Sequence, residues 1–133
     1  MTFQQLLSAG YERANQLQTY WAFYATLVLG VLAFFGSARR SRSIATLVTI
    51  GFIAVAAANL LALIDVSRQR LVLQHYLVAT AGSDAMLVSL AGTLTPWSLL
   101  VVMAFHLLFD LFTIGSIWAL TLKTNVRREL PPL

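Results

Sequence analysis

Residues 96–122 read PWSLLVVMAFHLLFDLFTIGSIWALTL and decide the fold. His106 and Asp110 are the only residues with ionisable side chains in this run, and they lie one helical turn apart. As a helix rising about 1.5 Å per residue, the run is long enough to cross a hydrocarbon core of about 30 Å. Because Thr95 can cap a helix and Pro96 suits a first helical position, we expect a transmembrane helix over residues 96–122.

Two further apolar runs also predict transmembrane helices. They are TYWAFYATLVLGVLAFFGS, residues 19–37, and SIATLVTIGFIAVAAANLLALI, residues 43–64, and neither contains a charged residue. Of the 133 residues, 59% are hydrophobic and 11% are charged, whereas soluble domains carry about 25% charged residues. The sequence therefore predicts an all-α integral membrane protein with three transmembrane helices, and residues 1–133 are expected to form a single membrane domain.

Two less apolar segments flank these runs. In residues 2–18 the apolar side chains recur at helical spacing, which predicts an amphipathic helix that lies in the membrane interface and leads into the first span. In residues 66–94 we expect an extension of the second helix, a break at Gly82, a cap at Ser83–Asp84 and a short helix. Together these features form a helical excursion on the outer side of the membrane.

The charged residues predict the orientation of the helices. The basic residues beside the apolar runs form two clusters, Arg39, Arg40 and Arg42 in the first loop, and Lys123, Arg127 and Arg128 after the third run. Three spans place both clusters on one side, whereas a fourth span over residues 71–94 would separate them and put Gly82 in mid-membrane. We therefore expect the N-terminus outside and the C-terminus in the cytoplasm, in a bacterial inner membrane. Both clusters can also contact lipid headgroups. On the outer side two arginines are balanced by two aspartates: Arg68, Arg70, Asp65 and Asp84.

A polar stripe runs along the third span. Its members recur at helical spacing and are Met103, His106, Asp110, Thr113 and Thr121, with the apolar Ile117 between the threonines. A charged Asp at the centre of a membrane helix costs about 2.5–3.5 kcal/mol, so we expect this stripe to face protein. Counted from the middle of each span, Tyr24, Asn59 and His106 lie at one depth, with Asp110 a turn deeper. This predicts one polar layer shared by three helices.

Small side chains indicate which faces of the other two helices approach their neighbours. On the first span they are Thr19, Thr26, Gly30, Ala33 and Ser37, and on the second they are Ala45, Thr49, Ala56 and Asn59. Small and hydroxyl residues let helix backbones approach closely and hydrogen-bond in a membrane. We therefore expect both faces to bring the helices together.

Three interpretations of the polar stripe remain open. In the first, its members are structural hydrogen bonds between helices. In the second, His106 and Asp110 carry protons or ions in a channel or transport subunit. In the third, His106 is an axial ligand of haem in a quinone-linked membrane anchor, although the other histidine, His75, is expected outside the spans.

Motifs of other chemistries are missing from the sequence. It has no Cys, and no nucleophile elbow, HExxH zinc motif, phosphate loop or dinucleotide fingerprint. The net charge of +4 comes from short clusters beside membrane spans, so it does not predict nucleic-acid binding. We expect no enzyme activity, no metal and no cofactor. We expect a small accessory or assembly subunit that contacts the lipid bilayer and other membrane chains, or forms a homo-oligomer.

Overall fold

The computed structural model describes residues 2–37 and 40–126, with the side chains of residues 124–126 left out. In this part of the chain the regular elements are four helices, α1 (Phe3–Ser37), α2 (Arg42–Ala81), α3 (Ala85–Gly92) and α4 (Leu99–Val126). Helices α1, α2 and α4 are long and apolar enough to cross a membrane. The prediction of an all-α membrane protein with three spans is confirmed.

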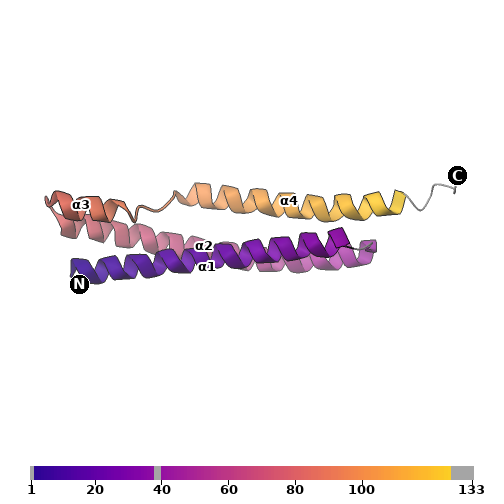
Figure 1. The fold of residues 1–133 in the computed structure, drawn as a ribbon, viewed down its shortest axis with the longest axis horizontal. Coiled ribbons are helices and arrows are strands. Elements are labelled where there is room, and N and C mark those ends of the chain that lie inside the picture. The colour runs from indigo at the N-terminus through magenta and orange to yellow at the C-terminus, as the bar shows by residue number, and fades with distance from the viewer. Residues whose placement is uncertain (1, 38–39, 127–133) are drawn as a thin grey trace.

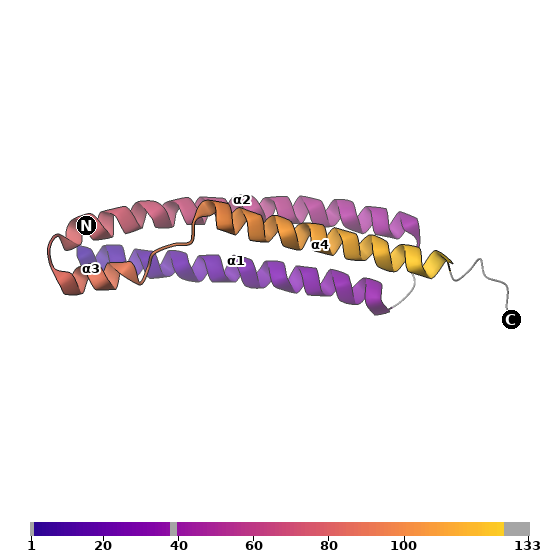
Figure 2. The same ribbon diagram turned by 90° about the horizontal axis from the view of Figure 1, so that it is seen from above.

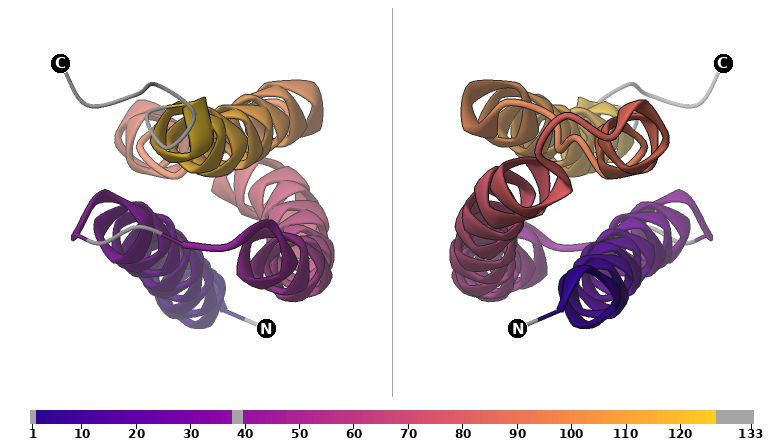
Figure 3. Two further views of the ribbon diagram at one scale, coloured as in Figure 1. Left: turned by 90° about the vertical axis from the view of Figure 1, so that its right-hand side faces the viewer. Right: turned by 90° about the vertical axis from the view of Figure 1, so that its left-hand side faces the viewer.

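The three long helices lie side by side (Figure 1). Helix α1 starts beside α3 and runs to the α1–α2 connection, α2 returns, and α4 runs in the same direction as α1 (Figures 1 and 2). Seen end-on, the long helices lie around a shared centre, and α2 contacts each of the other three helices (Figure 3). We call the end of the bundle that carries α3 the α3 end, and the end with the α1–α2 connection the loop end.

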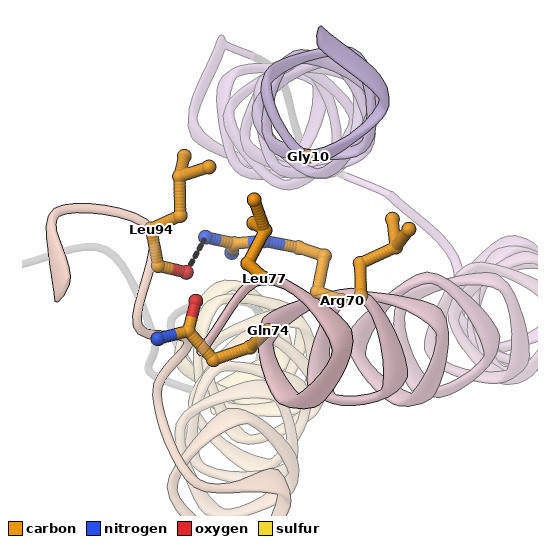
Figure 4. Close-up of a pocket in the computed structure, with 6 residues that line it drawn as sticks. Gly10, Arg70, Gln74, Leu77 and Leu94 are labelled. Atoms are coloured by element: carbon orange, nitrogen blue, oxygen red, sulfur yellow. Dashed lines mark hydrogen bonds between the residues drawn. The ribbon is translucent and has the colours of Figure 1, made fainter. Parts of the chain in front are cut away.

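Helices α1 and α2 are longer than a membrane requires. Their 35 and 40 residues span about 52 and 60 Å, against a hydrocarbon core of about 30 Å. At the α3 end, the first part of α1 packs through Leu6 against Leu77 and Leu94, and Gly10 lies over the same two leucines (Figure 4). Residues 2–18 are therefore helical as predicted, and they continue into the first span as one helix, with Leu6 and Gly10 packed against protein.

The predicted break in residues 66–94 is present. Helix α2 continues to Ala81 and ends at Gly82, whose φ of +57° suits a residue without a Cβ. The side chain of Asp84 then accepts hydrogen bonds from the backbone amides of Met86 and Leu87 and caps α3. Local capping chemistry therefore places the short helix back against α2.

The predicted start of the third span is wrong by three residues. Helix α4 begins at Leu99, and the hydroxyl of Ser98 accepts a hydrogen bond from the backbone amide of Val101. Thr95 does not cap α4: its hydroxyl accepts from the side-chain amide of Gln74 and donates to the carbonyl of Gly92 at the end of α3. Pro96 lies in the connection between the two helices.

Three apolar clusters follow one another along the bundle. At the α3 end are Leu6, Leu77, Ala91 and Leu94, in the middle are Tyr24, Val28, Phe52 and Ala56, and toward the loop end are Phe35, Ala45 and Ile117. The middle cluster brings α1 and α2 together beside the predicted polar layer, with which it shares Tyr24. The cluster toward the loop end joins α1, α2 and α4.

The prediction from small residues holds for one helix and fails for the other. On α2, Ala45, Ala56 and Asn59 are buried among the helices. On α1, the small residues all lie on the exposed surface: Thr19, Thr26, Gly30, Ala33 and Ser37. Helix α1 instead packs through a face of larger side chains that includes Tyr24, Val28 and Phe35.

Candidate functional site

Four polar side chains meet between the three long helices: Tyr24, Asn59, His106 and Asp110. We call this group the polar cluster. The hydroxyl of Tyr24 donates to Asp110 Oδ1 at 2.6 Å, and Asp110 Oδ2 lies 3.0 Å from His106 Nδ1. The other ring nitrogen of His106, Nε2, lies 3.3 Å from Asn59 Nδ2. One chain of hydrogen bonds thus links α1, α4 and α2.

The roles of donor and acceptor follow from the chemistry of the partners. An ionised carboxylate only accepts, and the amide nitrogen of Asn59 only donates. A neutral His106 with its proton on Nδ1 satisfies both contacts, since Nδ1–H then donates to Asp110 and Nε2 accepts from Asn59. The 2.6 Å contact between Tyr24 and Asp110 has the length expected of a hydroxyl bonded to a carboxylate.

Helical spacing positions these groups. His106 and Asp110 are four residues apart on α4, so both project from one face and pair directly. The ring of Tyr24 stacks on the imidazole of His106 with centroids 4.2 Å apart, and Trp21, one turn earlier on α1, approaches the same imidazole at 5.9 Å. The aromatic rings hold the imidazole so that both of its nitrogens meet a partner.

The polar cluster is shielded from its surroundings. The side chain of His106 is 0% exposed and that of Asp110 is 16% exposed. Toward the loop end, Phe35, Ala45 and Ile117 form an apolar cluster. Within the described residues, this arrangement satisfies a carboxylate in mid-bundle and separates it from the loop end.

The other predicted members of the polar stripe face inward but stay outside the network. Thr113 is fully buried, and its hydroxyl donates to the carbonyl of Phe109 on its own helix. Thr121 is also buried and bonds to the carbonyl of Ile117. Thr49 on α2 has a buried hydroxyl oxygen without a hydrogen-bond partner among the described residues.

The described residues of the two predicted basic clusters do not share one environment. Arg40 places its guanidinium over the ring of Phe34 with 3.9 Å to the centroid. Arg42 and Lys123 are exposed. Three other members, Arg39, Arg127 and Arg128, lie outside the described residues.

The haem interpretation does not fit the polar cluster. Iron needs a free imidazole nitrogen, whereas both ring nitrogens of His106 are in hydrogen-bonding contact. His75 is exposed on α2, and its 16-residue separation from Asn59 corresponds to about 24 Å along the helix. The two histidines therefore cannot hold one haem between them in this arrangement.

A cavity that sequence reasoning missed lies on the α3 side of the polar cluster. Its volume is about 350 Å³, and α1, α2, α4 and the α3–α4 connection all contribute to its lining. Trp21 both lines this cavity and packs on His106. On α2 it is lined by Ser67 and Arg70, which continue the buried face of Asn59 by helical spacing. That continuation is the sequence signal that could have found them.

Comparisons with protein-family models, with curated proteins and with solved structures find no match to this chain. Its function therefore has to be argued from its own residues.

Proposed function

We propose that this chain is a small non-enzymatic membrane subunit, an accessory or assembly component that joins a larger complex or its own copies through its transmembrane surface. In this proposal the polar cluster is structural, and it holds three helices in register. Each of its four side chains has a hydrogen-bond partner within the chain, which supports this role. Buried hydrogen bonds of this kind contribute about 0.5–2 kcal/mol each in membranes.

The observation that carries the proposal is the exposed small-residue face of α1. Thr26 and Gly30 on this face line an apolar groove of about 430 Å³ between α1 and α2, together with Leu27, Val31, Phe34 and Val48. A Cβ added at Gly30 would meet nothing within 4 Å. Small residues favour close helix–helix approach in lipid, so the groove suits a transmembrane helix from another chain.

The proposed location is a bacterial inner membrane, with the N-terminus outside and the C-terminus in the cytoplasm. Arg40, Arg42 and Lys123 belong to the loop end of the bundle, and Arg39, Arg127 and Arg128 flank them in the sequence. This common location supports the proposed orientation, because basic residues concentrate on the cytoplasmic side. A reporter fused after Leu133 tests it, and activity on the non-cytoplasmic side would contradict it.

The association is tested by cross-linking in native membranes, followed by native mass spectrometry after gentle solubilisation. We expect the wild-type chain in assemblies larger than a monomer. Gly30→Leu fills the groove and should reduce the assembled fraction by about tenfold. Gly115→Leu is the matched control, because Gly115 lies in α4 and its added Cβ would also meet nothing within 4 Å.

Only monomers in gently solubilised wild-type samples would contradict the proposal. Equal assembly of the Gly30→Leu and Gly115→Leu proteins would mean that the groove takes lipid chains and is not the interface.

A second candidate function is proton conduction through His106 and Asp110. The hydrogen-bond chain from Asn59 to Tyr24 beside the cavity favours it, whereas the apolar cluster toward the loop end opposes it. Reconstitution of the pure protein in liposomes and measurement of proton flux separates the candidates. If the Asp110→Asn substitution abolishes the flux without reducing assembly, conduction is favoured over the structural role.

A further inference from the structure

The cavity on the α3 side of the polar cluster contains a cation without a counter-ion. Arg70 lines it from α2 and is only partly exposed. Among the described residues the only ion pair is that of His106 with Asp110, so no carboxylate lies within 4 Å of the Arg70 guanidinium. The aspartates that balance Arg70 in the sequence are engaged elsewhere, Asp65 with Gln69 and Asp84 with the amides of α3.

Arg70 also makes a hydrogen bond within the protein, which uses little of its capacity to donate hydrogen bonds. One of its terminal nitrogens donates to the carbonyl of Leu94 at 3.4 Å, beneath Gly10 and beside Gln74 (Figure 4). This is a long hydrogen bond, and a guanidinium has five N–H groups. The remaining donors leave Arg70 able to bind an anion in the cavity.

Further donors lie on the same cavity wall. Ser67 is buried, and its hydroxyl makes no hydrogen bond to another described residue. The amide of Gln18 and the indole N–H of Trp21 also belong to lining residues. An anion in the cavity that accepts from Ser67 and Arg70 would replace hydrogen bonds that these donors otherwise make to water.

Apart from Thr95, the rest of the lining is apolar and aromatic. Leu17, Pro96, Trp97 and Val102 contribute to it, and Trp97 is well exposed. By residue count, Gln18 lies about 15 Å from the middle of the first span, close to the edge of a hydrocarbon core of about 30 Å. By the same count Arg70 lies further out, about 25 Å from the middle of the second span, so the cavity suits a molecule with a charged head at Arg70 and an apolar chain beside the tryptophans.

We propose that this cavity binds an anionic amphiphile, with its phosphate or carboxylate on Arg70 and Ser67 and its apolar chain beside Trp21 and Trp97. The volume of about 350 Å³ lies at the small end of ligand sites, so it holds the head and the first part of the chain. The ligand belongs to the α3 end, separate from the groove on α1, and the inference does not depend on the proposed function.

The test measures binding through tryptophan fluorescence. Two of the three tryptophans line the cavity, and Trp118→Phe removes the third, which lies in the cluster toward the loop end. The full-length protein is placed in nanodiscs of phosphatidylcholine and titrated at alkaline pH with a dibrominated fatty acid, whose bromines quench nearby indoles. The methyl ester of the same fatty acid is the neutral probe. We expect the carboxylate to quench at concentrations about tenfold lower than the ester.

Arg70→Gln should lower the affinity for the carboxylate by about tenfold or more, because it removes the only cation in the lining. Arg68→Gln is the matched control on the same helix. Arg68 is exposed and lines no part of the cavity, so its loss should change affinity by less than about twofold. Arg70→Lys keeps the charge and should retain most of the binding if the fold is intact. Equal quenching by acid and ester, or equal affinity of Arg70→Gln and Arg68→Gln, would overturn the proposal.

Unlabelled competitors identify the source of the anion. Displacement by phosphatidylglycerol would support a bilayer lipid as the ligand. Displacement by a single-chain alkyl phosphate but not by phosphatidylglycerol would support a single-chain amphiphile. Displacement by inorganic phosphate at the same concentration as the alkyl phosphate would contradict any contribution from the apolar chain.

Discussion

The middle of the bundle and its α3 end are held together by different forces. In the middle, polar side chains from three helices bond to one another in the polar cluster. At the α3 end, the buried side chains are the apolar Leu6, Leu77, Ala91 and Leu94, and polar contacts are confined to the edge of this cluster, such as the long hydrogen bond from Arg70 to the carbonyl of Leu94. In lipid, apolar side chains gain little by leaving a solvent as apolar as themselves, so packing and hydrogen bonds decide the association. Beyond the hydrocarbon core, burial of apolar surface from water becomes the main driving force again. The two regions should therefore respond to different substitutions.

The largest effect is expected at the α3 end. Leu77 is 0% exposed and packs in the apolar cluster there. Leu77→Ala should destabilise the packing of α3 and the first part of α1 by about 2–5 kcal/mol. Hydrogen exchange should show faster exchange in residues 3–14 and 85–92, with the middle of the bundle unchanged. Val78→Ala is the exposed neighbour and should leave exchange near wild type. Equal loosening of both regions would mean that they unfold as one unit.

The next effect breaks the polar cluster. Asp110→Leu removes the acceptor of Tyr24 and His106 and leaves two buried donors unpaired. The helices should then dissociate more easily by about 1–3 kcal/mol, measured by reversible unfolding in mixed micelles. Asp110→Asn keeps an acceptor, so this variant should lose much less stability. Leu111→Ala is the control on the lipid-facing side of α4. An Asp110→Leu protein as stable as wild type would show that the cluster does not hold the helices.

A smaller effect isolates one hydrogen bond of the cluster. Tyr24→Phe keeps the ring that stacks on His106 and removes only the hydroxyl that donates to Asp110. Single hydrogen bonds between membrane helices contribute about 0.6 kcal/mol on average and at most about 1.7 kcal/mol. The same unfolding measurement should give a loss in this range. Tyr20→Phe removes a hydroxyl that bonds to no other described residue, and it should be silent.

The polar cluster could be predicted from the sequence because depth is readable in a membrane helix. Counting residues at about 1.5 Å each placed Tyr24, Asn59 and His106 at one level, and the structure brings all three together with Asp110. The stacking of Tyr24 on His106 could not be predicted, because it depends on how α1 is rotated about its own axis. That rotation also explains why the small residues of α1 face outward.

The fold at the α3 end was less predictable, for a related reason. The helix break at Gly82 and the cap at Asp84 depend only on the local sequence, so they could be predicted. The continuation of residues 3–18 along the first span instead depends on contacts with Leu77 and Leu94, which lie far away in the sequence. The start of α4 differs from the prediction because the Thr95 hydroxyl accepts from the side-chain amide of Gln74, far away in the sequence, instead of from an amide of α4.

The smallest effect tests how tightly the α3 end is packed. A Cβ on Gly10 would lie 2.8 Å from Leu94 Cδ1, the far end of a flexible side chain, and 3.7 Å from Leu77 Cδ1. Gly10→Ala should gain about 1 kcal/mol of helix propensity and lose a similar amount as Leu94 moves aside. Gly51→Ala, in the interior of α2, meets nothing within 4 Å and should keep its gain. The difference between the two variants in thermal stability therefore measures the cost of displacing Leu94. If Gly10→Ala stabilises as much as Gly51→Ala, Leu94 moves freely and the α3 end is loosely packed. A loss well beyond about 1 kcal/mol would mean that Leu94, whose carbonyl bonds to Arg70, is fixed in place.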